Sequence, residues 1–349
     1  MGQIVSGIFA GSGVGIDSGA GIIAGKPDMP SAIEEALAAL LPPAGPFLLR
    51  GYLHYAGQPE PRNVTPNAMG LYVTDRIALD LAVCYRAHND PQGFCDFVRS
   101  MVRRYGEALA SIQIGEEPNN PHAATGGDGS FAGIHQALIL GVKAAKDEAK
   151  RLGLPIGVGI NAVISFDHND LFWPTLAAQG DATFYDSLDY VGIDFYPGVF
   201  APLPPGLDHA SATKAVLGHF RNTNLVAGKV PPSLPMRITE IGWPTSPERS
   251  PELQAEVVAA ILEGVFEISE ELNITHRAFF GLRDADSSEQ GLRFGLLYDD
   301  YRPKPAFAVY ASWIRQHAPS LWSQHRGRAA ATPKRKSRAY GEKGSASQL

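Results

Sequence analysis

Stretches of consecutive apolar, often β-branched residues alternate along the chain with stretches in which apolar residues recur at helical spacing. The first kind predicts eight strands, over residues 4–10, 46–55, 77–85, 110–115, 155–165, 190–196, 236–240 and 277–282. The second kind predicts helices over residues 30–41, 90–109, 130–152, 251–272 and 304–317. Several strand segments are apolar at nearly every position, which is typical of strands covered on both faces.

Strands that alternate with helices favour parallel pairing, because parallel neighbours need crossover connections. Eight such strands in a chain of 349 residues fit a closed (β/α)8 TIM barrel of the α/β class, with long loops. We expect this barrel to form a single domain over residues 1–320. An open doubly wound sheet is the alternative, but the glycine-rich segment Gly11–Gly15 lacks the spacing of a dinucleotide-binding turn.

Two local patterns refine this prediction. Ser31 is expected to cap the first helix, with Glu34 three positions later completing a capping box. Residues 57–75 are rich in Pro and Asn and therefore predict a loop, instead of a full helix, as the second crossover.

The composition, 44% hydrophobic and 19% charged, is that of an ordinary globular protein. No stretch approaches the roughly 18 consecutive apolar residues of a membrane-spanning helix. The net charge of −6 argues against a nucleic-acid-binding surface on the main body. We therefore expect neither nucleic acid nor a membrane as a partner, and a monomeric or weakly associating protein. Cys84, in an apolar strand, and Cys95, in a helical stretch, are expected to be free thiols.

The two ends of the chain differ in character. The first residues lead directly into the first predicted strand without a basic segment, so a cytoplasmic location is expected. A chain trimmed of an export signal would look the same, which leaves the compartment open. Residues 321–349 place Lys and Arg among Ala, Ser and Gly, and predict a flexible basic tail.

The most informative residues are two glutamates at predicted strand ends. Residues 114–119, with the sequence IGEEPN, end the fourth strand, and residues 238–245, ITEIGWPT, end the seventh. Glu117 and Glu240 therefore lie where a strand stops and a loop begins, and such ends meet at one face of a barrel. Hydrolysis of a glycosidic bond needs such a pair: one carboxyl protonates the leaving oxygen, and the other attacks or stabilises an oxocarbenium-like centre.

With these motifs at strands four and seven, the chain resembles the clan A glycoside hydrolases over residues 1–320. Glu117-Pro118 resembles the Glu-Pro of their strand-four motif, and residues 239–244 are similar to the strand-seven motif of β-1,3-glucanase-like families. The resemblance implies a barrel acting on a carbohydrate, with Glu117 as acid/base, Glu240 as nucleophile and no metal or organic cofactor. A carboxyl separation of about 5–5.5 Å would give retention through a covalent glycosyl intermediate.

The resemblance also implies supporting roles. Arg50 matches the arginine that holds down the pKa of the nucleophile, although a salt bridge within the barrel would equally explain it. Tyr196 matches the tyrosine that donates a hydrogen bond to the nucleophile. Trp243 offers an aromatic face for a sugar ring, or simply packs in the core. Further candidates for binding sugar hydroxyls, each with a structural role as the alternative, are His54, His88, Asn89 and Asn119.

Two positions depart from the family pattern. Glu116 stands where the family has an asparagine that binds the substrate 2-hydroxyl; its carboxylate would add a third negative charge and raise the pKa of its neighbour. Either the substrate is unusual at this position, or the assignment of roles between Glu116 and Glu117 is wrong. Strand eight carries Phe280 in place of the usual tryptophan platform, and Arg283 with Asp284 would reach an acidic or heavily hydroxylated ligand. Glu117 itself must stay protonated, so a dry site or a nearby carboxylate is expected.

We therefore predict a retaining glycoside hydrolase that cleaves a β-linked glycoside, oligosaccharide or polysaccharide. A metal-dependent barrel hydrolase is disfavoured, because the first strand has no His-x-His and the other histidines lack ligand spacing. A non-catalytic sugar-binding barrel is the alternative that Glu116 favours. The sugar, the linkage and the choice between internal and terminal cleavage stay open.

Overall fold

The computed structural model describes residues 4–12, 25–122, 126–289 and 291–317. Eight parallel strands close into a barrel in the order β1-β9-β8-β7-β6-β5-β4-β2, and β1 also pairs with β2. The strands are β1 (Val5–Phe9), β2 (Phe47–Tyr55), β4 (Ile77–Tyr85), β5 (Leu109–Ile114), β6 (Gly157–Val163), β7 (Tyr190–Phe195), β8 (Met236–Ile241) and β9 (Ile274–Phe280). The predicted TIM barrel is confirmed. The predicted tail, residues 321–349, lies outside the described residues.

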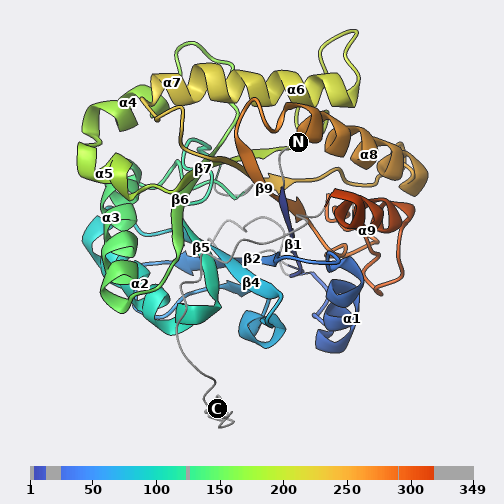
Figure 1. The fold of residues 1–349 in the computed structure, drawn as a ribbon, viewed down its shortest axis with the longest axis horizontal. Helices are drawn as coiled ribbons and strands as arrows, with labels where there is room; N and C mark the ends of the chain where they lie inside the picture. Colours follow the sequence, from blue (N-terminus) through green and yellow to red (C-terminus); the bar gives the residue numbers. More distant parts are fainter. Residues whose placement is uncertain (1–3, 13–24, 123–125, 290, 318–349) are drawn as a thin grey trace.

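Helices form an outer ring around these strands (Figure 1). They are α1 (Pro30–Leu40), α2 (Pro91–Tyr105), α3 (Ile134–Leu152), α4 (Phe172–Gln179), α5 (Ala182–Ser187), α6 (His209–His219), α7 (Leu225–Ala227), α8 (Pro251–Ile268) and α9 (Pro305–His317). Short helical turns are η1 (Met69–Tyr72), η2 (Gly106–Ala108) and the π-helical η4 (Phe220–Asn224). The second crossover is the predicted loop, with η1 and the two-residue β3 (Val64–Thr65), which pairs antiparallel with β2.

The start of α2 shows how the sequence fixes a helix end. Asp90 is the N-cap residue, and its Oδ1 accepts a hydrogen bond from the backbone N–H of Gly93 at 3.0 Å, while Pro91 occupies the first helical position. The predicted cap of α1 is wrong. That helix begins at Pro30, with Met29 as N-cap residue, so Ser31 lies inside the first turn. Proline at the first position needs no hydrogen bond to its nitrogen, so the helix starts at Pro30 and its N-cap lies two residues before the predicted one.

Inside the barrel, a level of polar side chains lies beside an apolar cluster of Phe9, Tyr52, Ala82 and Cys84. All nine residues of β2 are buried. At the polar level, buried side chains from five strands face one another: Arg50, Asp80, Gln113, Asn161 and Asp194. Buried polar groups persist only when they are hydrogen-bonded, so this layer has to form a connected network.

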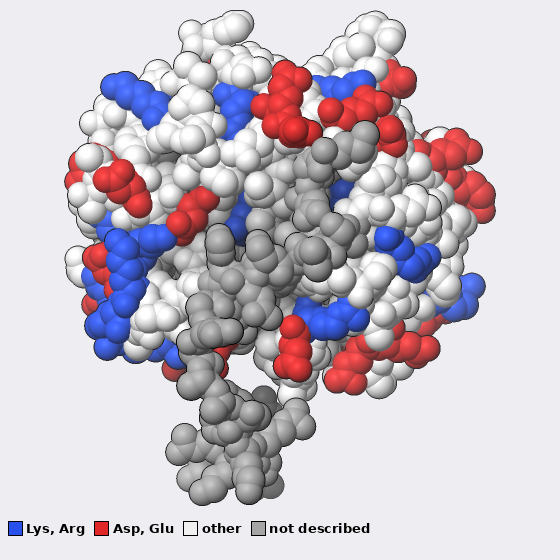
Figure 2. Space-filling view, viewed as in Figure 1, with Lys and Arg blue, Asp and Glu red and all other residues white. Residues whose placement is uncertain are grey.

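The surface of the barrel carries charges of both signs. Acidic and basic side chains are interspersed on the face in Figure 2, outside the part covered in grey. Among the described helices, none combines the length and apolar character needed to cross a membrane. Cys84 and Cys95 are buried free thiols, as predicted.

Candidate active site

Glu240 reaches the barrel interior because β8 contains a bulge. Ile238 pairs with Ile193 of β7, but the next β7 residue, Asp194, pairs with Glu240, so Thr239 is an extra residue. Consecutive residues of a regular strand point to opposite faces, whereas a bulge redirects a side chain. Here the Thr239 hydroxyl donates to Asp194 Oδ1 at 2.5 Å, and Glu240 also lies inside the barrel.

Two tyrosine hydroxyls hold the Glu240 carboxyl group. Tyr52 of β2 donates to Oε1, and Tyr196, just beyond β7, donates to Oε2. The contact expected for Tyr196 is therefore present. Arg50 Nε donates to the Tyr52 oxygen at 3.0 Å, which orients that hydroxyl's proton toward Glu240. Donors on both oxygens favour the ionised form of this carboxyl group.

Glu117 lies in a tight loop directly after β5. Gly115 (φ 79°) and Glu117 (φ 40°) both have left-handed backbone, which glycine adopts freely and glutamate rarely does. The loop is held in place by the Glu117 N–H, which donates to Asn161 Oδ1 at 2.9 Å, and by Asn120 Nδ2, which donates to Glu117 Oε2 at 2.7 Å. Unfavoured backbone that neighbours enforce in this way is common at functional sites.

A buried aspartate fixes the same loop from the other side. Asp128 Oδ2 accepts hydrogen bonds from the backbone N–H groups of Tyr85 at 2.8 Å and of Glu116 at 2.7 Å. Its Oδ1 forms an ion pair with Arg86 Nε at 2.9 Å. The end of β4 and the loop after β5 are thereby joined through one carboxylate.

Arg50 supplies the cation expected beside the nucleophile, but its direct contacts are with other groups. Its guanidinium lies 3.1 Å from Asp80 Oδ2, 3.0 Å from Gln113 Oε1 and 3.2 Å from Glu116 Oε2. Its charge lowers the pKa of Glu240 from a distance, and Tyr52 links the two. Arg50 therefore forms salt bridges within the barrel, and its charge also favours the ionised form of Glu240.

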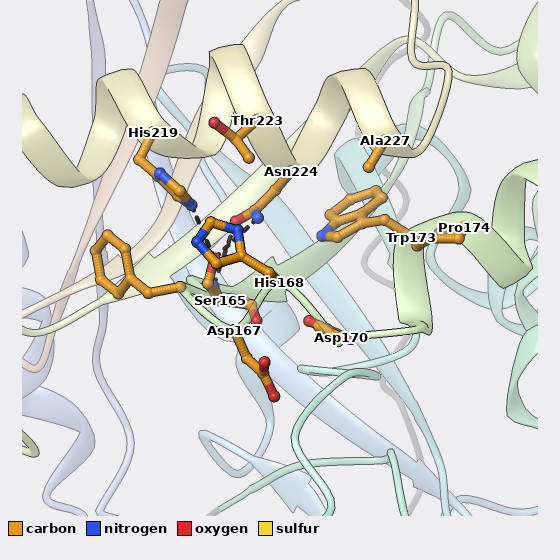
Figure 3. A pocket seen from close by; sticks show the side chains of 11 residues that line it. Ser165, Asp167, His168, Asp170, Trp173, Pro174, His219, Thr223, Asn224 and Ala227 are labelled. Atoms are coloured by element: carbon orange, nitrogen blue, oxygen red, sulfur yellow. Dashed lines mark hydrogen bonds between the residues drawn. The ribbon is translucent and has the colours of Figure 1, made fainter.

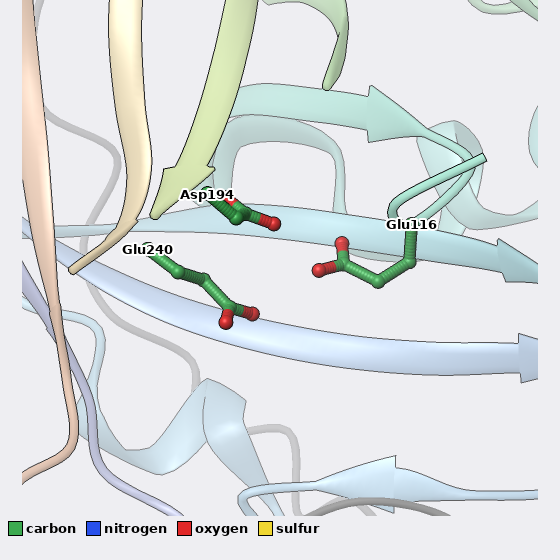
Figure 4. Close-up of side chains that lie close together, drawn as sticks. All are labelled: Glu116, Asp194 and Glu240. Atoms are coloured by element: carbon green, nitrogen blue, oxygen red, sulfur yellow. The ribbon is translucent and has the colours of Figure 1, made fainter. Parts of the chain in front are cut away.

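Glu116, Asp194 and Glu240 point toward one another in the barrel mouth (Figure 4). One oxygen of each lies within 4.8 Å of the others, and all three residues are buried. Two unit charges at 4.8 Å repel by about 3.5 kcal/mol at an effective dielectric constant of about 20. The oxygens are close enough to hold a cation, and the Arg50 guanidinium already lies beside Glu116.

Burial dominates the titration of the two predicted catalytic glutamates. It raises the pKa of Glu117 to about 8, and the negative charge of Glu240 adds to the effect. It also raises the pKa of Glu240 to about 8; the charge of Glu116 acts in the same direction, while Arg50 and the two tyrosine hydroxyls oppose it. Because ionisation of Glu240 favours the protonated form of Glu117, the pair holds one proton over a range of pH.

Several predicted substrate-binding residues have their polar groups engaged elsewhere. The Asn119 amide exchanges two hydrogen bonds, both 2.9 Å, with the backbone of Val163 at the end of β6. Arg283 is buried against Asp28 at 2.9 Å. His54 is buried and pairs with Asn63 at 3.0 Å, and burial lowers its pKa to about 3, so its imidazole is neutral. These contacts assign Asn119 and Arg283 to holding loops together.

The remaining candidates divide by exposure. Trp243 is buried, with the Arg249 guanidinium over its ring at 4.8 Å, which matches the packing alternative. His88 and Asn89 are exposed in the loop after β4. Phe280 is half-buried and stacks on Phe9 with ring centroids 4.8 Å apart. Its ring also lies 6.3 Å from that of Tyr196, so it lines the cluster.

Sequence reasoning missed the residues that complete this cluster: Tyr52, Asp80, Gln113, Asp128, Asn161 and Asp194. One signal was available. Arg50, Tyr52 and His54 alternate along β2 and therefore share its inward face. Asn161 connects the loop that carries Glu117 to Asp194 of β7. Its Oδ1 accepts from Glu117 N–H, and its Nδ2 donates to Asp194 Oδ2 at 2.5 Å.

A separate cavity of about 130 Å³ lies beyond the end of β6, between residues 165–174 and the segment His219–Ala227 (Figure 3). Two of its lining residues are linked, because the Asn224 side chain exchanges hydrogen bonds with the backbone of Ser165. Phe166 at its rim is 59% exposed and packs on His219 at 4.7 Å. Its lining shares no residue with the carboxyl cluster.

No protein-family model matches the chain, and neither does any curated protein. Solved structures do match. An apo β-glucosidase 1317 is 13% identical with a TM-score of 0.57, covering 83% of this chain and 88% of its own. A fungal β-1,4-galactanase is 11% identical with a TM-score of 0.58, and the match covers 89% of this chain and 99% of the galactanase. The exo-β-1,4-mannosidase Op5Man5 from Opitutaceae bacterium strain TAV5 is 12% identical with a TM-score of 0.59, and the match covers 90% of this chain and 60% of the mannosidase. These similarities establish the fold: the chain has the same (β/α)8 barrel fold as these solved structures.

Proposed function

We propose that the protein is a retaining glycoside hydrolase that cleaves a β-linked glycoside, oligosaccharide or polysaccharide. The observation that carries the proposal is the pairing of Glu240, held by two tyrosine hydroxyls, with a buried Glu117 whose pKa responds to the charge of Glu240. A nucleophile that is ionised beside an acid that keeps its proton is what double displacement requires. The glycosidase names of the solved structures with the same fold support the choice of reaction class.

In the first step the Glu240 carboxylate attacks the anomeric carbon, and Glu117 gives its proton to the departing glycosidic oxygen. The C–O bond to the leaving group breaks as the glycosyl ester on Glu240 forms. In the second step Glu117, now ionised, takes a proton from water as the water oxygen displaces Glu240 from the same carbon. The sugar leaves with its original anomeric configuration, and both glutamates regain their starting protonation states.

A panel of aryl glycosides covering several sugars and both anomers tests this proposal. We expect release of the aryl alcohol from at least one β-glycoside, and proton NMR of the first-formed sugar should show the β anomer. The competing hypothesis is a non-catalytic sugar-binding barrel. If titrations detect sugar binding while no glycoside in the panel is turned over, that hypothesis replaces ours.

The activity should fall at alkaline pH because Glu117 has to be protonated to act as an acid. Burial and the charge of Glu240 raise its pKa to about 8, so the donor form persists through neutral pH and is lost above that value. A pH profile of kcat/KM should therefore have its alkaline limb near pH 8. An activity that keeps rising well beyond that pH would contradict the role of Glu117.

Tyr52→Phe should move the acid limb of the same profile to higher pH. The substitution removes a donor that stabilises ionised Glu240, so the pKa of Glu240 rises, by about one unit for a hydrogen bond of about 1 kcal/mol. Tyr185→Phe is a matched control, because its hydroxyl donates to the backbone of Gly228 at 2.7 Å, away from the cluster. If the acid limb of the Tyr52→Phe profile lies at the wild-type pH, the Tyr52 hydroxyl does not stabilise ionised Glu240.

Phe200→Ala should weaken substrate binding more than it slows chemistry. Phe200 is 72% exposed, and its ring meets that of Tyr196 edge-on at 5.4 Å, so it offers an exposed aromatic surface next to the tyrosine that bonds to Glu240. Loss of one aromatic contact is expected to raise KM about three- to tenfold with little change in kcat. Phe166→Ala is the control, since Phe166 is similarly exposed but lies on the separate cavity. Equal effects from both variants would remove the case for a platform at Phe200.

A further inference from the structure

The hydrogen bonds around the three clustered carboxyl groups distinguish one of them from the other two. Both oxygens of Glu240 accept tyrosine hydroxyls. Both oxygens of Asp194 also accept, from the Thr239 hydroxyl and the Asn161 amide, each at 2.5 Å. A carboxyl group with donors on both oxygens is stabilised in its ionised form, because a carboxylate only accepts.

Glu116 is bonded differently. Its Oε2 accepts from Gln113 Nε2 at 2.6 Å and from Arg50 Nη2 at 3.2 Å. Within the described part of the chain, no donor is found on Oε1. The Glu116 carboxyl group points toward Asp194 and Glu240 (Figure 4), and one oxygen of each of the three lies within 4.8 Å of the others. Two carboxyl groups this close can hydrogen-bond to each other only if one of them carries a proton.

We propose that Glu116 is a neutral carboxylic acid whose proton, on Oε1, is donated to Asp194, so that it serves as a positioning residue for Glu240. Its catalytic consequence rests on the proposed function. A charged Glu116 would raise the pKa of Glu240, and a neutral one removes that obstacle to ionisation. The charged or titratable groups near Glu116 are Arg50 and Tyr52 of β2, Asp80 and Cys84 of β4, Glu117 of its own loop, Asp194 of β7 and Glu240 of β8.

The balance of charge favours this arrangement. Arg50 is the cation in contact with Glu116, and it also pairs with Asp80 at 3.1 Å. Burial and the charge of Asp194 raise the pKa of Glu116 well above its usual range, and Arg50 opposes them. With the proton on Glu116, Asp194 and Glu240 keep their charges and their donors. Burial and the charge of Glu240 also raise the pKa of Asp194, while Arg50 and the Thr239 hydroxyl oppose them. The Asn161 N–H on Asp194 Oδ2 can only donate, so a proton on that oxygen would meet a fixed donor.

The first test is the pH profile of Glu116→Gln. Glutamine is neutral, has nearly the same shape, and its amide can donate to Asp194. If Glu116 is already neutral, the substitution removes no charge, and the acid limb of the pH profile should stay in place whatever happens to kcat. If wild-type Glu116 is charged, its removal lowers the pKa of Glu240, and the limb moves to lower pH by about one unit or more. That shift would overturn the proposal. Glu248→Gln, an exposed glutamate in the loop after β8, is the matched control.

The second test needs no activity and uses infrared spectroscopy of the full chain at neutral pH. The variant Glu117→Gln lacks the other glutamate that we expect to be protonated, so its carboxylic acid C=O band should come from Glu116. That band should disappear in the double variant Glu117→Gln/Glu116→Gln. A band of the same intensity in the double variant would overturn the proposal. This result can be interpreted even if Glu116→Gln lowers turnover by disturbing the fold. If the protein cleaves no glycoside but the band behaves as expected, the proposed function fails and the protonation of Glu116 stands.

Discussion

Glu240→Gln should lower kcat on the order of 10⁴-fold or more, which is the largest effect expected of any single change. The amide cannot form the glycosyl ester, while its shape lets it keep contacts with Tyr52 and Tyr196. Substrate binding should therefore survive. The measurement is kcat on the best aryl glycoside of the panel, together with calorimetric titration of the same sugar into the variant.

Glu248→Gln is the control for this change, since Glu248 is exposed in the loop that follows β8 and bonds to Ser246. It should leave both turnover and binding at wild-type values. A Glu240→Gln protein that retains more than a few per cent of wild-type turnover, after purification from a strain free of glycosidases, would assign the nucleophile elsewhere.

Glu117→Ala should slow the enzyme in a way that depends on the leaving group. General acid catalysis contributes about 10²–10⁴-fold, so substrates with a poor leaving group should lose on the order of 10³-fold in kcat/KM. Activated aryl glycosides that depart without a proton should lose far less in the glycosylation step. Azide, which needs no general base, should restore turnover of these substrates and yield the glycosyl azide.

Glu107→Ala is the matched control, because Glu107 is exposed in η2, directly before the opposite end of β5. Its rates should not depend on the leaving group more than those of wild type. A uniform loss across all leaving groups in Glu117→Ala would indicate that Glu117 has a structural role.

The strands of this barrel could be predicted because their apolar runs are long and both faces are covered. Each of the eight predicted strand segments overlaps an observed strand. Helices α4 to α7 could not, since they are short and weakly amphipathic. In α6, for example, Ala, Ser, Gly and Thr interrupt the apolar stripe, and the start of the helix is fixed by Asp208, whose side chain accepts from Ser211 N–H at 2.7 Å.

Of the site, the sequence could locate Glu117 and Glu240, because both follow apolar runs within recognisable motifs. It could not reveal the bulge at Thr239, which depends on the pairing of β8 with β7. Asn119 and Trp243 occupy suggestive sequence positions, yet tertiary contacts engage the Asn119 amide and bury the Trp243 ring. Tyr52 and Asp194 carry no motif of their own. Their roles arise only when the closed barrel brings β2, β7 and β8 together.

The Glu116 departure from the family pattern also looks different in three dimensions. In sequence it is a third negative charge beside two others. In the folded chain its Oε2 lies against Arg50 and Gln113, and its other oxygen faces carboxylates that already have donors. A proton on that oxygen would make Glu116 a neutral donor, as an asparagine amide is.

Covalent trapping of the nucleophile tests the account most directly. The wild-type protein would be incubated with a 2-deoxy-2-fluoro β-glycoside of the sugar preferred in the panel, digested, and sequenced by tandem mass spectrometry. We predict one added fluoroglycosyl group per chain, carried by Glu240, and no label in Glu240→Gln. A label on any other residue would contradict the account, as would rapid turnover of the parent glycoside with inversion of the anomeric centre.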